Sequence, residues 1–387
     1  MHNNQLTQNL LLWFDENKRQ LPWRTDRSAY HTWISETMLQ QTRVNAVIPY
    51  YHRFLEVFPD IETLAEAEID HLNKIWEGLG YYSRARNLKK GAQYCVENFH
   101  GKLPEKPELL LQIPGIGPYT AGAISSMVYG YPVPAVDGNA IRVSARLFSL
   151  FITRQDAAGK KEVYQKLDDI LPKDRAGDFN EAIMDLGAGI CTPKSPGCGK
   201  CPVSNHCHAF NKQLQDVLPL KTKKKVSPIF PFTILIFRTE KEIYIRQRPP
   251  NGLLAGLFEF IPYPEKLSQN QLSALLKETF HTDTISDRQL LPLGDAKHVF
   301  SHLQWDMTGF IVQVPSKELI QQQIIPHVPK NESLTSTDLS SMQKNAMSFT
   351  ANDQKLTDLF TGNFYTAEDA RQLPFPSALK AYTSQIF

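Results

Sequence analysis

The segment from Leu110 to Val143 (LLQIPGIGPYTAGAISSMVYGYPVPAVDGNAIRV) constrains this chain more than any other. It opens with the turn Pro114–Gly117 between two stretches of helical character. Gly115 and Gly117 lack a Cβ, so they can adopt a positive φ and let another backbone approach closely. The backbone N–H groups at the start of the helix that follows suit a phosphate oxygen. The segment therefore predicts two helices joined by a turn that can hold a nucleic-acid backbone, although a Gly-x-Gly turn alone also occurs in ordinary loops.

A carboxylate follows this turn closely in the sequence. The second helix is predicted over Ala121–Tyr129 and ends at Gly130, since glycine is the preferred residue after a helix C-terminus. A short loop broken by prolines then leads to Val136–Asn139 at the start of another helix. We therefore expect Asp137 to lie near the turn.

The length and charge of the chain limit the kind of protein that it can be. A length of 387 residues predicts two or three domains. Residues 1–225 carry 28 Lys and Arg against 24 Asp and Glu, and the rest carries 14 against 16, so the first part is the better polyanion binder by a small margin. No signal peptide and no apolar run of membrane-spanning length is evident, so a cytoplasmic protein without membrane contact is expected. No heptads argue for an oligomer, so a monomer is expected.

Four of the five cysteines are clustered. Cys191, Cys198, Cys201 and Cys207 have the spacing C-x6-C-x2-C-x5-C, so four thiolates within 17 residues can surround one compact centre. Zinc sites more often use two separated pairs, so this run favours a [4Fe–4S] cluster, with zinc as the alternative. Cys95 stands apart and is predicted to be a buried thiol.

Two segments near the N-terminus could contact a base. Arg19–Arg24 (RQLPWR) is a predicted loop with groups that stack on or clasp a base; the alternative is a capping loop with one buried Trp. In the helix that follows, Ile34 and Met38 are spaced i, i+4 and are predicted to face the core. Glu36 lies away from this stripe and is expected to face solvent or a cleft. Pro49 is expected to end or kink this helix.

Residues 78–86 (GLGYYSRAR) combine a flexible turn with two tyrosines and two arginines. Aromatic and basic side chains together suit base stacking and phosphate contact, although the tyrosines of a turn can also pack inward.

The pattern changes after the basic run Lys221–Lys225, which marks a linker. Strands are predicted over 232–237, 242–246 and 305–314, with a helix near 268–280, so this part is an α+β domain. It has only scattered Glu residues, without the carboxylate run that holds divalent metal around a pyrophosphate. Residues 315–355 are polar and irregular and receive no assignment.

Several of these motifs together resemble one family. Ile113–Gly117 with Val136–Asn139 is similar to the helix-hairpin-helix and aspartate of the endonuclease III superfamily of DNA glycosylases. Lyases of that superfamily carry a Schiff-base lysine where this chain has Tyr119, and a tyrosine there resembles the adenine glycosylase (MutY) branch. Ser35–Thr42 (SETMLQQT) resembles a signature of that branch, and the cysteine spacing matches the superfamily's cluster loop. The resemblance covers almost the whole chain, least securely at 315–355.

The resemblance implies a role for individual residues. The catalytic group would be Glu36, Asp137, Asn139 and Tyr119. The pocket for the adenine base would be lined by Arg19, Trp23, Arg24, Leu39 and Glu181. Contacts with DNA would come from Gln41, Tyr81, Gly115 and Gly117, and recognition of 8-oxoguanine from Phe300, Ser301 and His302.

Excision of a purine needs an acid at the base and negative charge at the sugar. Glu36 would protonate the adenine, which requires a raised pKa, while Asp137 would stay ionised and stabilise the oxocarbenium ion. Without an amine nucleophile, the DNA strand would stay intact. The base must first leave the helical stack.

The resemblance therefore implies a multidomain protein. An all-α helix-hairpin-helix glycosylase domain with a [4Fe–4S] loop would span residues 1–220, a basic linker 221–228, and an α+β Nudix-like domain 229–387. The expected partner is duplex DNA that contains adenine opposite 8-oxoguanine or guanine. A bifunctional endonuclease III-type lyase and a non-catalytic iron–sulfur DNA-binding protein are the alternatives. A Nudix pyrophosphatase is disfavoured by the missing carboxylate run.

Overall fold

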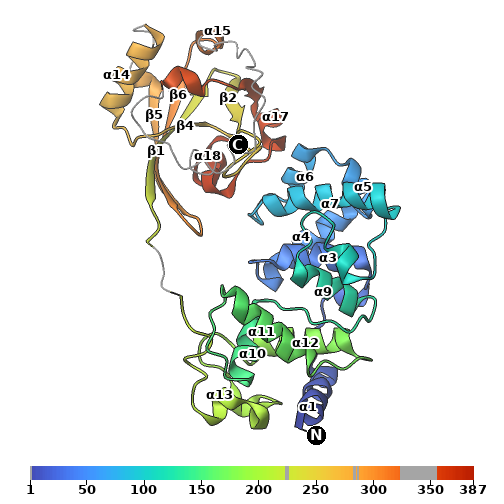
Figure 1. The fold of residues 1–387 in the computed structure, drawn as a ribbon. Coiled ribbons are helices and arrows are strands. Elements are labelled where there is room, and N and C mark those ends of the chain that lie inside the picture. Colours follow the sequence, from blue (N-terminus) through green and yellow to red (C-terminus); the bar gives the residue numbers. More distant parts are fainter. Residues whose placement is uncertain (1, 223–225, 282–284, 286, 323–354) are drawn as a thin grey trace, which may run out of the picture. The chain divides into compact units, whose positions relative to one another are not determined.

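The structure is a computed structural model that describes residues 2–222, 226–281, 285, 287–322 and 355–387. The chain divides into two compact units, one formed by residues 1–67 and 83–224 and the other by residues 68–82 and 225–387 (Figure 1). The sequence did not indicate that residues 68–82 would group with the C-terminal half. Among the described residues, no helix combines the length and the apolar character needed to cross a membrane.

The N-terminal unit is helical, as its sequence predicts. Its helices are α1 (His2–Asn17), α2 (Pro22–Thr25), α3 (Ala29–Leu39), α4 (Val44–Val57), α5 (Ile61–Glu66), α7 (Ser83–Phe99), α8 (Pro107–Leu110), α9 (Pro118–Met127), α10 (Gly138–Leu147), α11 (Ala157–Asp168), α12 (Ala176–Gly189) and α13 (His208–Asn211), with 3-10 turns at Cys198–Lys200 and Ser204–His206.

Helix α3 is buried on all sides. Glu36 is only 6% exposed, so of its two expected environments, solvent or a cleft, the structure excludes solvent. Pro49 does not end this helix. The chain turns at Gln41, whose φ is +61°, and Pro49 lies inside the next helix, α4.

The hairpin between α8 and α9 has the predicted form. Gly115 adopts a φ of +86°, and a Cβ there would lie 2.7 Å from the Cβ of Asn87 on α7. Gly117 is different, because it is the N-cap of α9 with a φ of −98° and has open space where a Cβ would be. The turn therefore requires glycine at Gly115 for its backbone conformation, whereas Gly117 leaves the start of α9 uncovered.

A hydrophobic core joins α1, α10, α11 and α12. Leu10 and Phe14 of α1 pack with residues of α10 and α12, and three of the clustered cysteines, Cys191, Cys201 and Cys207, pack against this core. The cysteine loop is thereby attached to the two helices that carry Asp137 and Glu181.

The C-terminal unit is built on a mixed seven-stranded sheet with the order β3-β2-β1-β6-β5, to which β4 adds beside β1 and β7 beside β2. The central strands β1 and β6 are parallel, and β5 and β6 form an antiparallel hairpin. Its elements are α6 (Ile69–Ile75), β1 (Ile229–Arg238), β2 (Glu242–Gln247), β3 (Phe258–Glu259), β4 (Ile261–Tyr263), α14 (Gln269–Phe280), β5 (Leu290–Val299), β6 (Gln304–Gln313), α15 (Glu318–Gln321), β7 (Asn363–Thr366), α17 (Ala367–Gln372) and α18 (Lys380–Ile386), with 3-10 turns at Asp287–Gln289, Leu356–Leu359 and Ser377–Leu379.

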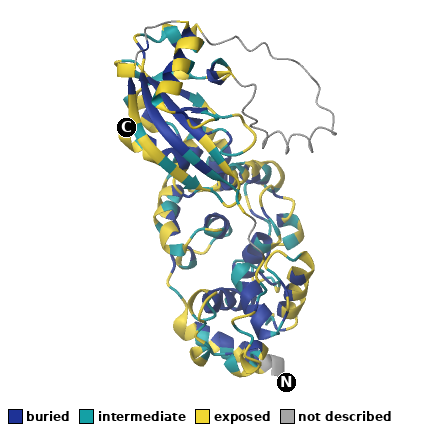
Figure 2. Cartoon of the chain, turned by 90° about the vertical axis from the view of Figure 1, so that its left-hand side faces the viewer, coloured by how far each residue is buried: buried dark blue, intermediate teal, exposed yellow. Residues whose placement is uncertain are grey.

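Both faces of this sheet are covered, so its central strands are buried (Figure 2). Because side chains alternate along a strand, Leu235 and Phe237 of β1 pack on the side of α14. Ile234 and Ile236 pack on the other side, with Tyr382 of α18. This arrangement confirms the predicted α+β fold. Lys223–Lys225 of the predicted linker lie outside the described residues, as does most of the unassigned segment 315–355.

Candidate active site

Three helices of the N-terminal unit bring Glu36, Tyr119 and Asp137 together. Glu36 lies in the middle of α3, Tyr119 in the first turn of α9, and Asp137 directly before α10. The hydroxyl of Tyr119 donates a short hydrogen bond to Glu36 Oε2 and also lies 4.0 Å from the sulfur of Met184 on α12. Residues from four helices thus converge on one buried carboxyl group.

The environment of Glu36 favours its neutral form. Burial raises the pKa of Glu36 to about 7, the hydrogen bond from Tyr119 lowers it, and the negative charges of Asp137 and Glu181 raise it. Near neutral pH this group can therefore give up a proton to an acceptor that enters the pocket.

Asp137 has different neighbours because of its position at a helix start. It is the N-cap of α10, and its carboxylate accepts hydrogen bonds from the Ala140 backbone N–H at 2.6 Å and from Asn139 Nδ2 at 2.8 Å. Burial raises the pKa of Asp137, and these two hydrogen bonds oppose that effect because they favour the charged form. The two carboxyl groups thus lie in one buried cluster but in unlike surroundings.

Arg142 extends this arrangement toward the cysteine loop. Its Nη2 donates to Asn139 Oδ1 at 2.8 Å and to the Gly187 carbonyl at 2.6 Å, and its Nε donates to the Cys191 carbonyl at 2.7 Å. One buried guanidinium therefore connects the side chain that orients Asp137 with the first cysteine of the cluster. The sequence analysis missed it; the available signal is the pair Arg142 and Arg146 in an otherwise apolar helix.

The predicted base-pocket arginines are already occupied by acidic partners. Asp185 on α12 accepts hydrogen bonds from Arg19 Nε at 2.7 Å and from both terminal nitrogens of Arg24 at 2.8 and 3.0 Å. Although burial alone would raise the pKa of Asp185, Arg24 and Arg19 hold it below its ordinary value. The segment Arg19–Arg24 is therefore fixed to α12, and its second half belongs to the short helix α2 and is not the predicted loop.

Glu181, predicted from the resemblance alone, is buried near Glu36. Arg27 Nη2 lies 2.9 Å from each of its oxygens, and Arg24 Nε lies 3.3 Å from Oε1. Burial nevertheless raises the pKa of Glu181 above its ordinary value, and the two arginines oppose this. Glu181 is therefore not a charge on the helix surface.

The other two predicted pocket residues are less polar. Trp23 is buried edge-on against Tyr51, with ring centroids 5.3 Å apart, and Leu39 is the half-buried last residue of α3.

Asn180 is a second residue that the sequence analysis missed. Its side chain accepts from the Ala135 backbone N–H at 3.0 Å and donates to the Val133 carbonyl at 2.9 Å and to Ser126 Oγ at 2.8 Å. These bonds fix the loop that leads into Asp137.

Two of the predicted DNA-contact residues lie at left-handed turns. Gln41 follows α3 in the N-terminal unit with a φ of +61°. Tyr81, in the C-terminal unit, has a φ of +49° and is 46% exposed. A positive φ is uncommon for residues other than glycine, so both side chains are held at constrained turns.

The four clustered cysteines line one pocket, together with Arg146, Gln215 and their neighbours. Arg146 Nη1 lies 3.3 Å from Cys191 Sγ. Within the described residues, no three His, Cys, Asp or Glu side chains are close enough to hold a single metal ion. A [4Fe–4S] cube differs from an ion because each thiolate binds a separate iron, so four thiols around one pocket fit it better than they fit zinc.

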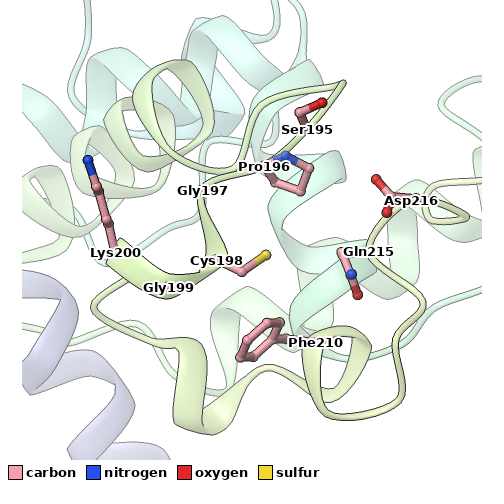
Figure 3. Close-up of a pocket in the computed structure, with 9 residues that line it drawn as sticks. All are labelled: Ser195, Pro196, Gly197, Cys198, Gly199, Lys200, Phe210, Gln215 and Asp216. Atoms are coloured by element: carbon pink, nitrogen blue, oxygen red, sulfur yellow. The ribbon is translucent and has the colours of Figure 1, made fainter.

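An unpaired amide supports this fit. Gln215 Oε1 is buried without a hydrogen-bond partner among the described residues, and Gln215 also lines the neighbouring pocket beside Cys198. Figure 3 shows the Cys198 thiol pointing into this second pocket and Lys200 pointing away from it. A rotation of the Gln215 amide by 180° would offer an N–H donor to a sulfur-rich group, which would remove the penalty of an unpaired polar atom.

In the C-terminal unit, Phe300, Ser301 and His302 form the tip of the β5–β6 hairpin. The Phe300 backbone N–H donates to the Leu303 carbonyl at 2.8 Å and closes the turn. Phe300 is anchored against Trp305, with centroids 5.2 Å apart, whereas Ser301 and His302 are exposed. The side chains of Ser301 and His302 are therefore exposed on a turn that the Phe300–Trp305 contact anchors.

Both halves of the chain match known protein families. Residues 34–173 match the HhH-GPD superfamily of base excision DNA repair proteins, and residues 232–385 match the NUDIX domain. The chain is 37% identical to the adenine DNA glycosylase of Rattus norvegicus over 76% of its own length and 68% of the relative. It is 35% identical to the adenine DNA glycosylase of Buchnera aphidicola subsp. Schizaphis graminum, over 80% of this chain and 87% of the relative.

A solved structure of a thermostable thymine-DNA glycosylase matches 55% of this chain and 99% of its own, with a TM-score of 0.50 and 27% identity.

Replacement of Glu36 by Gln should stabilise the protein in a pH-dependent way. Between the ordinary value of 4.5 and about 7, the unfolded chain releases a proton that folded Glu36 retains, so stability falls as the pH rises through this window. Glu36→Gln removes this loss. Urea unfolding should show that the variant gains about 2–3 kcal/mol relative to the parent between pH 5 and pH 8.

The exposed Glu97→Gln on α7 is the control and should show no such trend. An equal difference between Glu36→Gln and the parent at both pH values would contradict a neutral Glu36.

Proposed function

Since the chain belongs to the adenine DNA glycosylase family, we propose that it hydrolyses the N-glycosidic bond of adenine in duplex DNA. The observation that carries this proposal is the pair of carboxyl groups in unlike surroundings. Glu36 is buried under the Tyr119 hydroxyl, and Asp137 accepts hydrogen bonds at the start of α10. An acid and a carboxylate in one pocket are what glycoside hydrolysis requires.

In the proposed reaction, Glu36 protonates the adenine. Adenine is a poor leaving group until a ring nitrogen, here N7, carries a proton. The flipped base would exclude water and so keep the pKa of Glu36 near the working pH. Tyr119 would fix the carboxyl group through its hydrogen bond.

Asp137 acts at the sugar. As the glycosidic bond breaks, positive charge develops on the deoxyribose, and an ionised Asp137 stabilises it. Asn139 donates to one oxygen of Asp137 and Ala140 to the other, so the carboxylate is oriented before the substrate arrives. Water then takes the place of the base.

The adenine reaches this pocket by leaving the base stack. Gln41 and Tyr81 would fill or kink the duplex, which costs a few kcal/mol for unstacking. The open N-terminus of α9 after Gly115 and Gly117 would hold a phosphate of the same strand.

The product should be an intact strand with an abasic site. A lyase needs an amine nucleophile, and Tyr119 stands where related lyases carry a lysine. Purified protein incubated with a duplex that contains one adenine opposite 8-oxoguanine should give cleavage at that adenine only after alkali. Glu36→Gln should lower the excision rate by a factor of about 100 or more.

Nicking without alkali would instead indicate a bifunctional lyase. Binding without any base release would indicate a non-catalytic DNA-binding protein.

We further propose that Cys191, Cys198, Cys201 and Cys207 hold a [4Fe–4S] cluster. The bound group would brace the loop that α10 and α12 support, and it supplies no step of the reaction. Iron and acid-labile sulfide analysis of protein purified without oxygen should give about four of each per chain. Cys198→Ser should lower both, whereas Cys95→Ser, far from the loop in sequence, should change neither. Stoichiometric zinc would contradict this assignment.

Substrate choice is proposed to depend on the second domain. Adenine is a normal base, so its identity cannot mark a lesion, and the opposite base must be recognised. We propose that residues 1–220 excise the adenine, residues 221–228 link the domains, and residues 229–387 recognise 8-oxoguanine. The support is the hairpin tip, where Ser301 and His302 are exposed on an anchored turn.

The double variant Ser301→Ala, His302→Ala should lower discrimination between adenine opposite 8-oxoguanine and adenine opposite guanine by a factor of about ten, because one or two hydrogen bonds are lost. Single-turnover excision from both duplexes measures it. Ser316→Ala, a serine after β6 and away from the hairpin tip, is the control. An unchanged ratio would exclude this tip as the reader.

A further inference from the structure

Arg27 occupies a position that none of the proposed steps uses. It lies between α2 and α3, and its guanidinium reaches across to α12, where Nη2 lies 2.9 Å from both oxygens of Glu181. Its Nη1 donates to the Met127 carbonyl at the end of α9 at 3.1 Å. The Glu181 side chain is only 7% exposed, so its charge depends on this partner and on Arg24.

The charged groups around Glu181 come from several elements. Arg24 of α2 and Arg27 face it with positive charge and Asp185 of α12 with negative charge, while the Glu36 carboxyl group of α3, whose own pKa is raised, is also near. Arg24 is shared, because both of its terminal nitrogens bind Asp185 and only its Nε approaches Glu181, at 3.3 Å. Of these two arginines, Arg27 is therefore the one that pairs with Glu181 and not also with Asp185.

We propose that Arg27 is a positioning residue that keeps Glu181 ionised and fixed as a hydrogen-bond acceptor for the exocyclic amine of the excised base. This inference rests on the proposed function, since adenine, the proposed leaving base, carries that donor as its 6-amino group. A protonated Glu181 would keep only a neutral carbonyl oxygen as acceptor, so its hydrogen bond to the amine would be weaker.

The geometry also links Arg27 to the catalytic acid. The negative charge of Glu181 is one of the influences that raise the pKa of Glu36. If Arg27 is removed, an influence that lowers the pKa of Glu181 is lost, so this pKa rises further and Glu181 keeps its proton to a higher pH. Glu36 then loses a repulsive neighbour, so its own pKa falls. The pH range in which Glu181 is charged and Glu36 is protonated therefore narrows at both its acid and its alkaline end.

Arg27→Gln tests this inference through the pH dependence of the single-turnover excision rate. In the variant, the acid limb of the pH–rate profile should shift to higher pH and the alkaline limb to lower pH. The maximal rate should fall by about ten-fold. In parallel, the protein alone, labelled with 13C at the glutamate carboxyl carbons, should show the Glu181 titration about one pH unit higher than in the parent. Glu181→Gln assigns that signal.

Two variants provide the controls. Arg27→Lys keeps the charge but not the paired geometry, so its pH profile should lie between those of the parent and Arg27→Gln. Arg175→Gln removes the ion pairs to Asp15 and Asp178 at the start of α12, the helix that carries Glu181. It should leave the width of the pH–rate profile unchanged.

The outcomes separate this inference from the proposed function. If Arg27→Gln lowers the rate equally at every pH and the Glu181 titration does not move, Arg27 only braces α9 against α12 and the inference is overturned. If the parent does not release adenine, the proposed function is overturned. The carboxyl titration then still decides whether Arg27 holds Glu181 ionised.

Discussion

The active site depends on the burial of several carboxyl groups in one small region. Such groups repel one another and lose hydration, so each needs its own compensation. Burial beneath the Tyr119 hydroxyl raises the pKa of Glu36, Asp137 is hydrogen-bonded at a helix start, and Asp185 is paired with two arginines. Arg27 and Arg24 lie against Glu181. These carboxyl groups thus have different neighbours, and the proposed chemistry requires that difference.

Helix α12 is the element that makes these compensations possible. It supplies Asn180 to the loop before Asp137, Glu181 to the pocket and Asp185 to the Arg19–Arg24 loop. Asn180 and Glu181 are adjacent and therefore point in different directions around the helix, and Asp185 lies about one turn after Glu181. The helix contributes no reacting group to the proposed mechanism, but its side chains contact the residues and the loop that the mechanism uses.

The sequence predicted the secondary-structure elements and motifs better than the burial and the partners of individual side chains. The hairpin, the position of Asp137 at the start of a helix and the strands of the C-terminal sheet follow from local patterns, and the structure has them. For Glu36 the sequence left solvent and a cleft open, because a helical stripe implies a solvent side; α3 has none, so solvent is excluded. Arg27 and Asn180 were missed because their partners lie 154 and 45 to 54 residues away, and no local pattern indicates such a pair. The roles of Glu181 and Ser301 came only from family resemblance.

The packing of residues 68–82 bears on how the two halves can be separated. This segment lies within the HhH-GPD match, but it packs with residues of the NUDIX match. Tyr82 donates to the Phe375 carbonyl at 3.3 Å, the Phe375 N–H donates to Glu77 at 3.1 Å, and Lys74 donates to the Leu373 carbonyl at 3.1 Å. Removal of residues 225–387 would delete these bonds and uncover Tyr82, next to the exposed Tyr81. A loss of activity in the truncated chain would therefore combine the loss of lesion recognition with disturbance of a proposed DNA-contact turn, and only substitutions at the hairpin tip separate the two.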